Sequence, residues 1–96
     1  MNLGLGIKQI RKSKGISQGE LAEKIGLSPA SMSMIENGVK RPTSKNLKKI
    51  CDVLGVPEAL IYLYTLEDSD IPKSKKEIYH TYYPYVKDML TKIIEK

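Results

Sequence analysis

The sequence predicts an all-α protein in which five short helices are followed by an additional C-terminal helical segment. Three observations favour this fold class. Apolar residues recur three or four positions apart along most of the chain, which places them on one face of a helix. Serine, threonine or proline precedes most of these runs and glycine follows them, as at the starts and ends of helices. No stretch of useful length alternates between apolar and polar residues as a half-buried strand would.

The first two predicted helices are separated by a short break after Gly15. The apolar face of the first consists of Leu3, Ile7 and Ile10. Ser17 begins the second helix, and Glu20, three residues later, completes a capping box. Gly26 ends this helix, because glycine adopts a left-handed backbone at low cost just past a helix.

The third predicted helix restarts almost at once. Ser28 is an N-cap residue, and Pro29 fits the first helical position because the missing N–H has no partner there. The inward side chains are Met32 and Ile35, and the helix stops at residues 37–38. Residues 39–42, Val-Lys-Arg-Pro, then form an exposed basic loop.

The fourth and fifth helices complete the first domain. Thr43 or Ser44 caps the fourth, and Gly55 ends it. Its apolar face consists of Leu47, Ile50, Cys51 and Leu54. Pro57 opens the fifth helix, over residues 58–64, with Leu60 and Ile61 facing inward.

We place a domain boundary after residue 66, so that residues 1–66 form one domain and 67–96 a linker and C-terminal segment. Residues 65–73 are acidic, contain a proline and lack a period. The later apolar residues that fall near one helix face are Ile78, Tyr82, Val86, Met89, Leu90 and Ile93. Because a proline inside a helix costs about 3 kcal/mol, Pro84 predicts a kink near Tyr83 or a second helix that starts at Pro84.

The net positive charge of the protein comes entirely from its first two thirds. Residues 1–65 contain ten Lys or Arg and five Asp or Glu, whereas residues 66–96 contain six of each sign, for a net charge of +5. This distribution favours a polyanionic partner for the first domain. A contribution to solubility alone is the alternative explanation.

The stretch SQGELAEKIGLSPASMSMIENGVKRP, residues 17–42, has the pattern of a helix-turn-helix, in which two short helices are joined by a tight turn that contains glycine. The outward residues of the second helix are small or slim and uncharged, which suits close approach to base edges. This stretch resembles the lambda-repressor-like (Cro/repressor, XRE) family of DNA-binding domains. The resemblance covers about residues 5–64. It implies a five-helix fold with the helix at 29–37 in the major groove of double-stranded DNA.

The resemblance also implies roles for individual positions. The side chains that face the bases would be Pro29, Ala30, Ser31, Ser33 and Met34. Those that hold the sugar-phosphate backbone would be Gln18, Ser28, Asn37, Lys40, Arg41 and Lys45. Arg11 would form a structural ion pair with Glu36. Pro29 and Ala30 depart from the hydrogen-bonding residues of the best-studied members, so specificity is expected to rest on Ser31, Ser33, contact of Ala30 or Met34 with thymine methyls, and DNA shape.

We expect a small homodimeric regulator, a repressor, in the cytoplasm. The residues expected to form the dimer are Tyr79, Tyr82, Val86, Met89 and Ile93, because tyrosine is enriched at interfaces. The alternative for this segment is an intramolecular strut. Two other functions remain: an antitoxin-type autoregulator whose residues 67–96 bind a toxin protein and are loosely structured alone, and a protein-interaction adaptor that does not bind DNA.

An enzyme is not expected, because no nucleophile–base pair or paired-carboxylate pattern occurs in the sequence. The single cysteine, Cys51, is expected in the core, and with one His no zinc cluster forms. No cofactor and no membrane association are expected, since no apolar run approaches the roughly 20 residues of a membrane span.

Overall fold

The computed structural model describes residues 1–95, and within this range it contains helices and no strands. The helices are α1 (Leu3–Ser13), α2 (Gln18–Ile25), α3 (Pro29–Glu36), α4 (Ser44–Leu54), α5 (Glu58–Tyr64) and α6 (Lys76–Ile94). Two short 3₁₀ helices, η1 (Asp68–Asp70) and η2 (Lys73–Lys75), lie between α5 and α6. The predicted all-α fold with five helices and a C-terminal helical segment is confirmed.

Local side-chain chemistry sets the helix starts. Ser17 Oγ accepts from the Glu20 N–H at 3.1 Å, and Glu20 Oε1 accepts from the Ser17 N–H at 3.3 Å, which together form the predicted capping box. Thr43, and not Ser44, caps α4, because Thr43 Oγ1 accepts from the Asn46 N–H at 3.1 Å.

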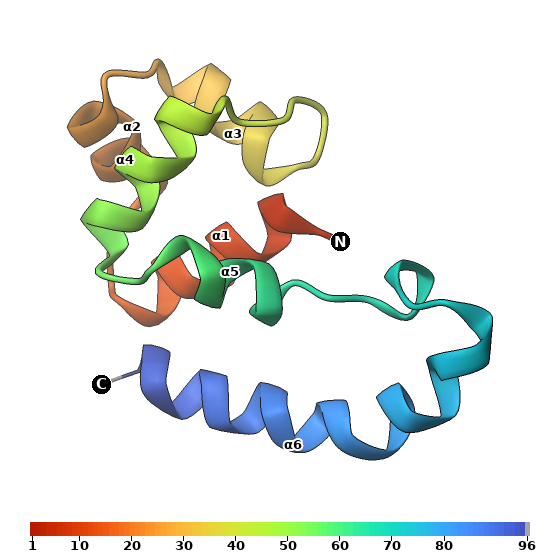
Figure 1. Ribbon diagram of the computed structural model, residues 1–96. Helices are drawn as coiled ribbons and strands as arrows, with labels where there is room; N and C mark the ends of the chain where they lie inside the picture. Colours follow the sequence, from red (N-terminus) through yellow and green to blue (C-terminus); the bar gives the residue numbers. More distant parts are fainter. Residues whose placement is uncertain (96) are drawn as a thin grey trace.

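Figure 1 shows α1 and α5 in the middle of the molecule, with α2, α3 and α4 on one side and α6 on the other. The helices bury one shared apolar core. Its members are Leu3, Ile7, Ile10, Leu21, Ala22, Ile25, Met32, Ile35, Leu47, Ile50, Cys51, Leu54, Val56, Ile61 and Ile94. Because Ile94 lies in this core, the C-terminal turns of α6 fold as part of the same unit as α1–α5.

The helix α6 is a single helix from Lys76 to Ile94 with Pro84 inside it. Of the two alternatives that Pro84 offered, the second helix starting at Pro84 is therefore wrong, and the kink near Tyr83 stays a prediction. Pro84 lies on the exposed side of α6. The carbonyl of His80, which loses its intrahelical donor, is on this same side, where water can replace that hydrogen bond. A different side of α6 packs on the domain through Leu90 and Ile94.

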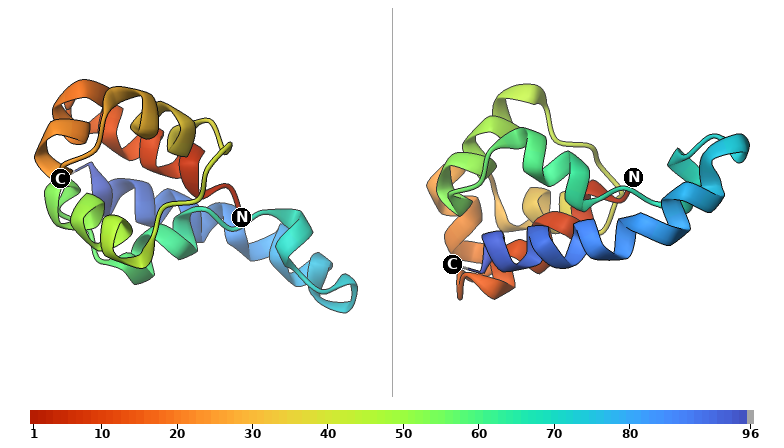
Figure 2. Two further views of the ribbon diagram at one scale, coloured as in Figure 1. Left: turned by 90° about the horizontal axis from the view of Figure 1, so that it is seen from above. Right: turned by 60° about the horizontal axis from the view of Figure 1, so that its bottom comes forward.

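The linker is more ordered than its sequence indicates. Asp68 of η1 accepts from Lys76 Nζ at 2.6 Å and also pairs with His80 Nε2. These contacts hold the pKa of Asp68 below its usual value, with the Lys76 bond as the main cause. Figure 2 shows the linker and the first turns of α6 projecting beyond the rest of the protein.

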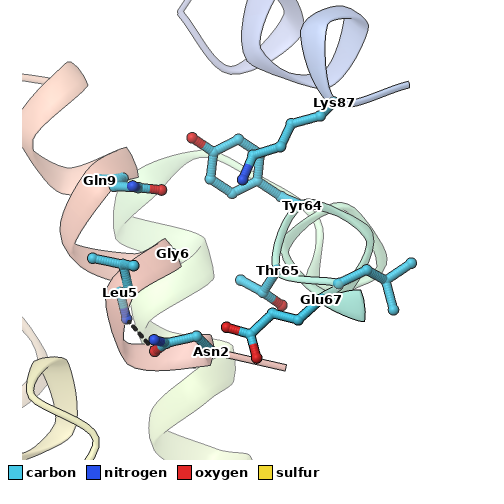
Figure 3. A pocket seen from close by; sticks show the side chains of 9 residues that line it. Asn2, Leu5, Gly6, Gln9, Tyr64, Thr65, Glu67 and Lys87 are labelled. Carbon is cyan, nitrogen blue, oxygen red and sulfur yellow. Dashed lines mark hydrogen bonds between the residues drawn. The ribbon is translucent and has the colours of Figure 1, made fainter. Parts of the chain in front are cut away.

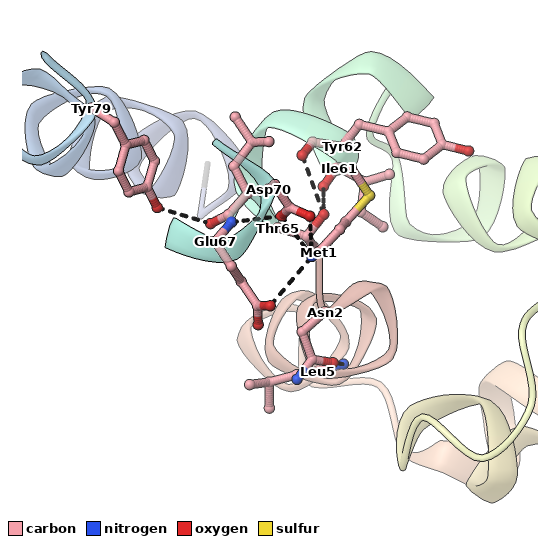
Figure 4. Close-up of polar contacts among 10 residues, drawn as sticks. Met1, Asn2, Leu5, Ile61, Tyr62, Thr65, Glu67, Asp70 and Tyr79 are labelled. Carbon is pink, nitrogen blue, oxygen red and sulfur yellow. Dashed lines mark hydrogen bonds and ion pairs between the residues drawn. The ribbon is translucent and has the colours of Figure 1, made fainter. Parts of the chain in front are cut away.

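The start of α1 is tied to the end of α5 and to the linker (Figure 4). The Asn2 N–H donates to the Thr65 carbonyl at 3.3 Å, and the Met1 ammonium pairs with Glu67 at 3.3 Å and with Asp70 at 2.6 Å. Beside these contacts a cavity of about 60 Å³ lies between α1 and residues 64–67 at the end of α5 and the start of the linker, and Lys87 of α6 reaches over the Tyr64 ring at its edge (Figure 3).

Candidate nucleic-acid interface

The turn between α2 and α3 depends on one left-handed residue. Gly26 follows α2 with φ 75° and ψ 27°, and the Leu27 N–H returns to the Ala22 carbonyl at 2.9 Å. Ser28 then caps α3 by accepting from the Ser31 N–H at 3.1 Å, with Pro29 as the first helical residue. The two helices are therefore separated by only three residues.

The third helix has a buried side and an exposed side. Met32 and Ile35 are 0% and 2% exposed and fix α3 to the core. Pro29 and Ala30 are exposed on the other side, and Met34 retains 39% of its surface. The five residues expected to face the bases therefore include three that are open to solvent, while Ser31 and Ser33 are half-buried.

The polar side chains on the exposed side of α3 are hydrogen-bonded to one another. Ser28 Oγ donates to Ser31 Oγ at 3.0 Å. Asn37 Nδ2 donates to Ser33 Oγ at 3.3 Å across one helical turn. The serines that the sequence offered as base contacts thus already have partners within the protein.

The residues expected to hold the phosphate backbone surround this exposed side. Lys40 and Arg41 are exposed in the loop that follows α3, and Lys45 is exposed in the first turn of α4. Ser28 and Asn37 are exposed at the two ends of α3. Lys40 and Arg41 also border a cavity of about 180 Å³ between this loop and the start of α1.

Gln18 differs from the other members of that set because its side chain is half-buried. Gln18 Nε2 donates to Glu36 Oε1 at 3.1 Å. One end of its amide is therefore fixed at the last residue of α3, which leaves the amide oxygen for any external contact. The sequence did not predict this contact, since it joins two residues whose pairing depends on how α2 and α3 cross.

The Arg11–Glu36 pair lies at the junction of α1, α2 and α3. Arg11 Nε donates to Glu36 Oε2 at 2.7 Å and Arg11 Nη2 donates to Glu36 Oε1 at 2.9 Å, with 7% and 4% of the two residues exposed. Arg11 Nη1 also donates to the Ile16 carbonyl at 2.9 Å. The bond to Glu36 raises the pKa of Arg11 further. This bidentate geometry fixes the C-terminal end of α3 relative to α1.

The start of α1 makes a contact that sequence reasoning missed. A Cβ added at Gly4 would lie 2.2 Å from the Ile35 carbonyl oxygen and 2.9 Å from that of Glu36. Only glycine therefore lets α1 approach the end of α3 so closely. A glycine inside a helix, where alanine is preferred, is the sequence signal for such a contact.

The five residues expected to form the dimer recur at steps of three or four residues along α6, but only Tyr82, Met89 and Ile93 among them are exposed. Tyr79 is half-buried, donates from its hydroxyl to the Leu66 carbonyl at 3.3 Å and stacks on Tyr83, and Val86 is half-buried as well. The large apolar residues that are exposed on α6, which we call the α6 stripe, are Ile78, Tyr82, Tyr85, Met89 and Ile93, with 57%, 63%, 76%, 54% and 52% of their surface exposed. The steps of this stripe are four, three, four and four residues, as regular as those of the expected set, so spacing alone does not distinguish the two.

Neither a metal site nor a membrane span is found in the described part of the chain. No group of three or more His, Cys, Asp or Glu side chains lies together among residues 1–95. None of the helices described over these residues combines the length and apolarity that crossing a membrane requires. Cys51 is buried, and burial is the main cause that raises the pKa of its thiol to about 11.

Comparisons with known proteins match the part of the chain that carries this geometry. Residues 7–61 match a family described as "Helix-turn-helix". The chain is 44% identical over 55 residues to the HTH-type transcriptional regulator SinR of Bacillus subtilis (strain 168), a match that covers 56% of this chain and 50% of that protein. It is 39% identical over 54 residues to the ImmF control region 10 kDa protein of Bacillus phage phi105, with 56% of this chain and 60% of that protein covered. The chain thus spans about half the length of these relatives.

Proposed function

The chain belongs to the helix-turn-helix family matched at residues 7–61, and from this premise we propose that it binds double-stranded DNA sequence-specifically as a cytoplasmic transcriptional regulator. We further propose that it acts as a homodimer and represses by occluding promoter DNA, with α3 in the major groove. SinR is named as a transcriptional regulator and the phage protein as a control-region protein, which supports a regulatory role.

One observation carries this proposal: the exposed side of α3 is slim and uncharged, and cationic residues flank it. The major groove admits an α-helix, and slim side chains let that helix approach the base edges closely, whereas long charged ones would hold it away unless they paired with bases themselves. Ala30 and Met34 are slim and uncharged, while Lys40 and Arg41 in the next loop are available for phosphates. Phosphate contacts position the protein and base contacts specify the sequence.

The decisive experiment is selection of binding sites from random duplexes at a defined salt concentration. A sequence-specific dimer is expected to enrich a two-fold symmetric site with half-sites about 34 Å apart. Failure to bind any duplex, even at low salt, would exclude the proposal and favour the adaptor alternative. Enrichment of an asymmetric site would exclude the symmetric dimer.

The contribution of phosphate contacts is tested by the salt dependence of binding. Replacing Arg41 with Ala should weaken binding to every duplex and reduce the slope of log K against log salt by about one unit. Lys75→Ala is the matched control, since Lys75 is exposed in η2, on the linker that projects away from α3. If the two variants have the same slope, Arg41 does not contact a phosphate.

Dimerisation is assigned to the α6 stripe, which retains Tyr82, Met89 and Ile93 from the expected set. Met89→Glu should shift the protein to a monomer in sedimentation analysis, because a charge would have to be buried between the two copies. Val39→Glu is the control, since Val39 is an apolar residue in the loop after α3 that is 75% exposed, against 54% for Met89. A Met89→Glu protein that remains dimeric would refute this assignment.

The antitoxin alternative receives less support. It expects residues 67–96 to be loosely structured in the isolated protein, whereas the described part of this segment packs on the domain through Leu90 and Ile94. Hydrogen exchange on the isolated protein distinguishes the two. Protection of α6 amides favours the regulator, and free exchange throughout α6 favours the antitoxin.

A further inference from the structure

The base-facing side of α3 offers few groups that distinguish one base pair from another by hydrogen bonding. Ser31 is bonded to Ser28, and Ser33 is bonded to Asn37. A serine hydroxyl that did turn toward a base would also discriminate poorly, because it both donates and accepts. None of the residues within α3 carries the forked donor–acceptor pair that reads adenine or the paired donors that read guanine.

Apolar groups occupy the middle of the same side. Ala30 and Met34 are four residues apart, so their side chains lie one above the other along the helix. Both are open to solvent, and Met34 exposes 39% of its surface although it is apolar. A methionine side chain is flexible and polarisable, so it adapts to the shape of an apolar partner.

The major groove presents one apolar group on the normal bases, the C5-methyl of thymine. We propose that the Ala30–Met34 pair recognises thymine C5-methyl groups, and that the preferred duplex is identified mainly by the positions of its thymines. This inference rests on the proposed function, since it specifies how the same helix surface chooses its DNA. The serine pairs then act as slim spacers that let the helix approach the groove floor.

The test begins with the duplex selected from the random pool. Each thymidine is replaced in turn by deoxyuridine, which keeps the adenine pair and the O4 acceptor and removes only the methyl group. Binding is measured by fluorescence anisotropy at one fixed salt concentration. The dissociation constant is expected to rise about fourfold for each methyl that contacts the protein. This factor is the burial free energy of one methyl-sized group expressed as a ratio of dissociation constants.

Two variants connect the methyl effect to the proposed residues. Met34→Ser and Ala30→Gly remove the apolar atoms of exposed side chains and are expected to leave the fold intact, which circular dichroism checks. For each variant, replacing thymine by uracil at the positions that the changed side chain contacts should no longer change the dissociation constant. Arg41→Ala is the control, because loss of a phosphate contact should weaken both duplexes by the same factor and preserve the fourfold ratio.

The outcomes separate this inference from the function on which it rests. If the protein binds no duplex, the proposed function fails and the inference fails with it. If it binds a selected duplex that tolerates uracil at every position, or a site without thymine in either half, only the inference is overturned. If both variants keep the full thymine preference, another group recognises the methyl, which also overturns it.

Discussion

Replacement of Gly4 by Ala should destabilise the protein, although alanine is the better helix former. The added Cβ would lie 2.2 Å from the Ile35 carbonyl oxygen, about 1.2 Å short of ordinary contact at 3.4 Å. The obstacle is backbone at the end of α3, so α1 and α3 must separate. Overpacking of this kind costs about 1–3 kcal/mol, and we expect the upper end because no side chain can rotate away. The gain in helix propensity of about 1 kcal/mol leaves a net loss of about 2 kcal/mol.

Gly19 provides the matched control. Gly4 and Gly19 each occupy the second position of a helix, α1 and α2 respectively, but a Cβ added at Gly19 meets nothing within 4 Å. Gly19→Ala should therefore raise the free energy of unfolding by about 0.5–1 kcal/mol. Urea denaturation followed by circular dichroism measures both variants, at one protein concentration because the proposed dimer would make the stability depend on concentration. Equal effects of the same sign would refute the close-approach explanation.

Three further predictions concern ionisable or reactive groups. Glu36→Ala leaves Arg11 buried without its carboxylate and should cost about 3–5 kcal/mol of unfolding free energy, whereas replacing both residues by Met should restore most of it; urea denaturation of the variants decides. Cys51, with a pKa of about 11, should react with iodoacetamide near pH 8 only as fast as the protein unfolds, and rapid labelling of the native protein would contradict its burial. The contacts of Asp68 with Lys76 and His80 lower the pKa of the Asp68 carboxyl in the folded protein. The stability that they give the folded protein is therefore complete above the pKa of an unfolded Asp, about 3.9, and is lost as the pH falls through the lower pKa of the folded state. Asp68→Asn should therefore reduce the melting temperature near about pH 6 and leave it unchanged near about pH 2.

The helix boundaries of α1–α5 were predictable because residues within one or two turns decide them. The capping box at Ser17, the proline after Ser28 and the left-handed Gly26 each act through their own backbone and the nearest N–H groups. Such signals need no knowledge of what packs on the helix. The choice between Thr43 and Ser44 as the cap of α4 could not be made in this way, since both residues can accept the same bond.

The contacts between helices were harder to predict. The sequence indicated Arg11 with Glu36 only through a family resemblance, and it gave no reason to bring Gln18 to the same carboxylate. Gly4 belongs to this class as well, because its role exists only when α1 meets the end of α3. Each of these depends on crossing geometry that the hydrophobic pattern does not specify.

The side of α6 that faces the core could be predicted from the sequence only in part. Nearly every turn of this helix carries apolar or aromatic residues on two sides, so the pattern selects no single inner face. Packing selects it: Leu90 and Ile94 are buried at 5% and 3% exposure, while Met89 and Ile93, one position earlier in each turn, remain open. Neighbouring positions along the sequence, such as Met89 and Leu90, thus fall on the exposed side and on the core side of α6 respectively.

This arrangement links the proposed dimer to DNA recognition. The buried side of α6 is fixed to the core that also holds Met32 and Ile35 of α3. A second copy paired through the α6 stripe would therefore set the separation of the two recognition helices through packed side chains and not through a flexible linker. Deleting α6 would remove Ile94 from the core together with the interface, so loss of DNA binding by a truncated chain could not be assigned to either cause. Single substitutions within the stripe separate the two, because they leave Leu90 and Ile94 in place.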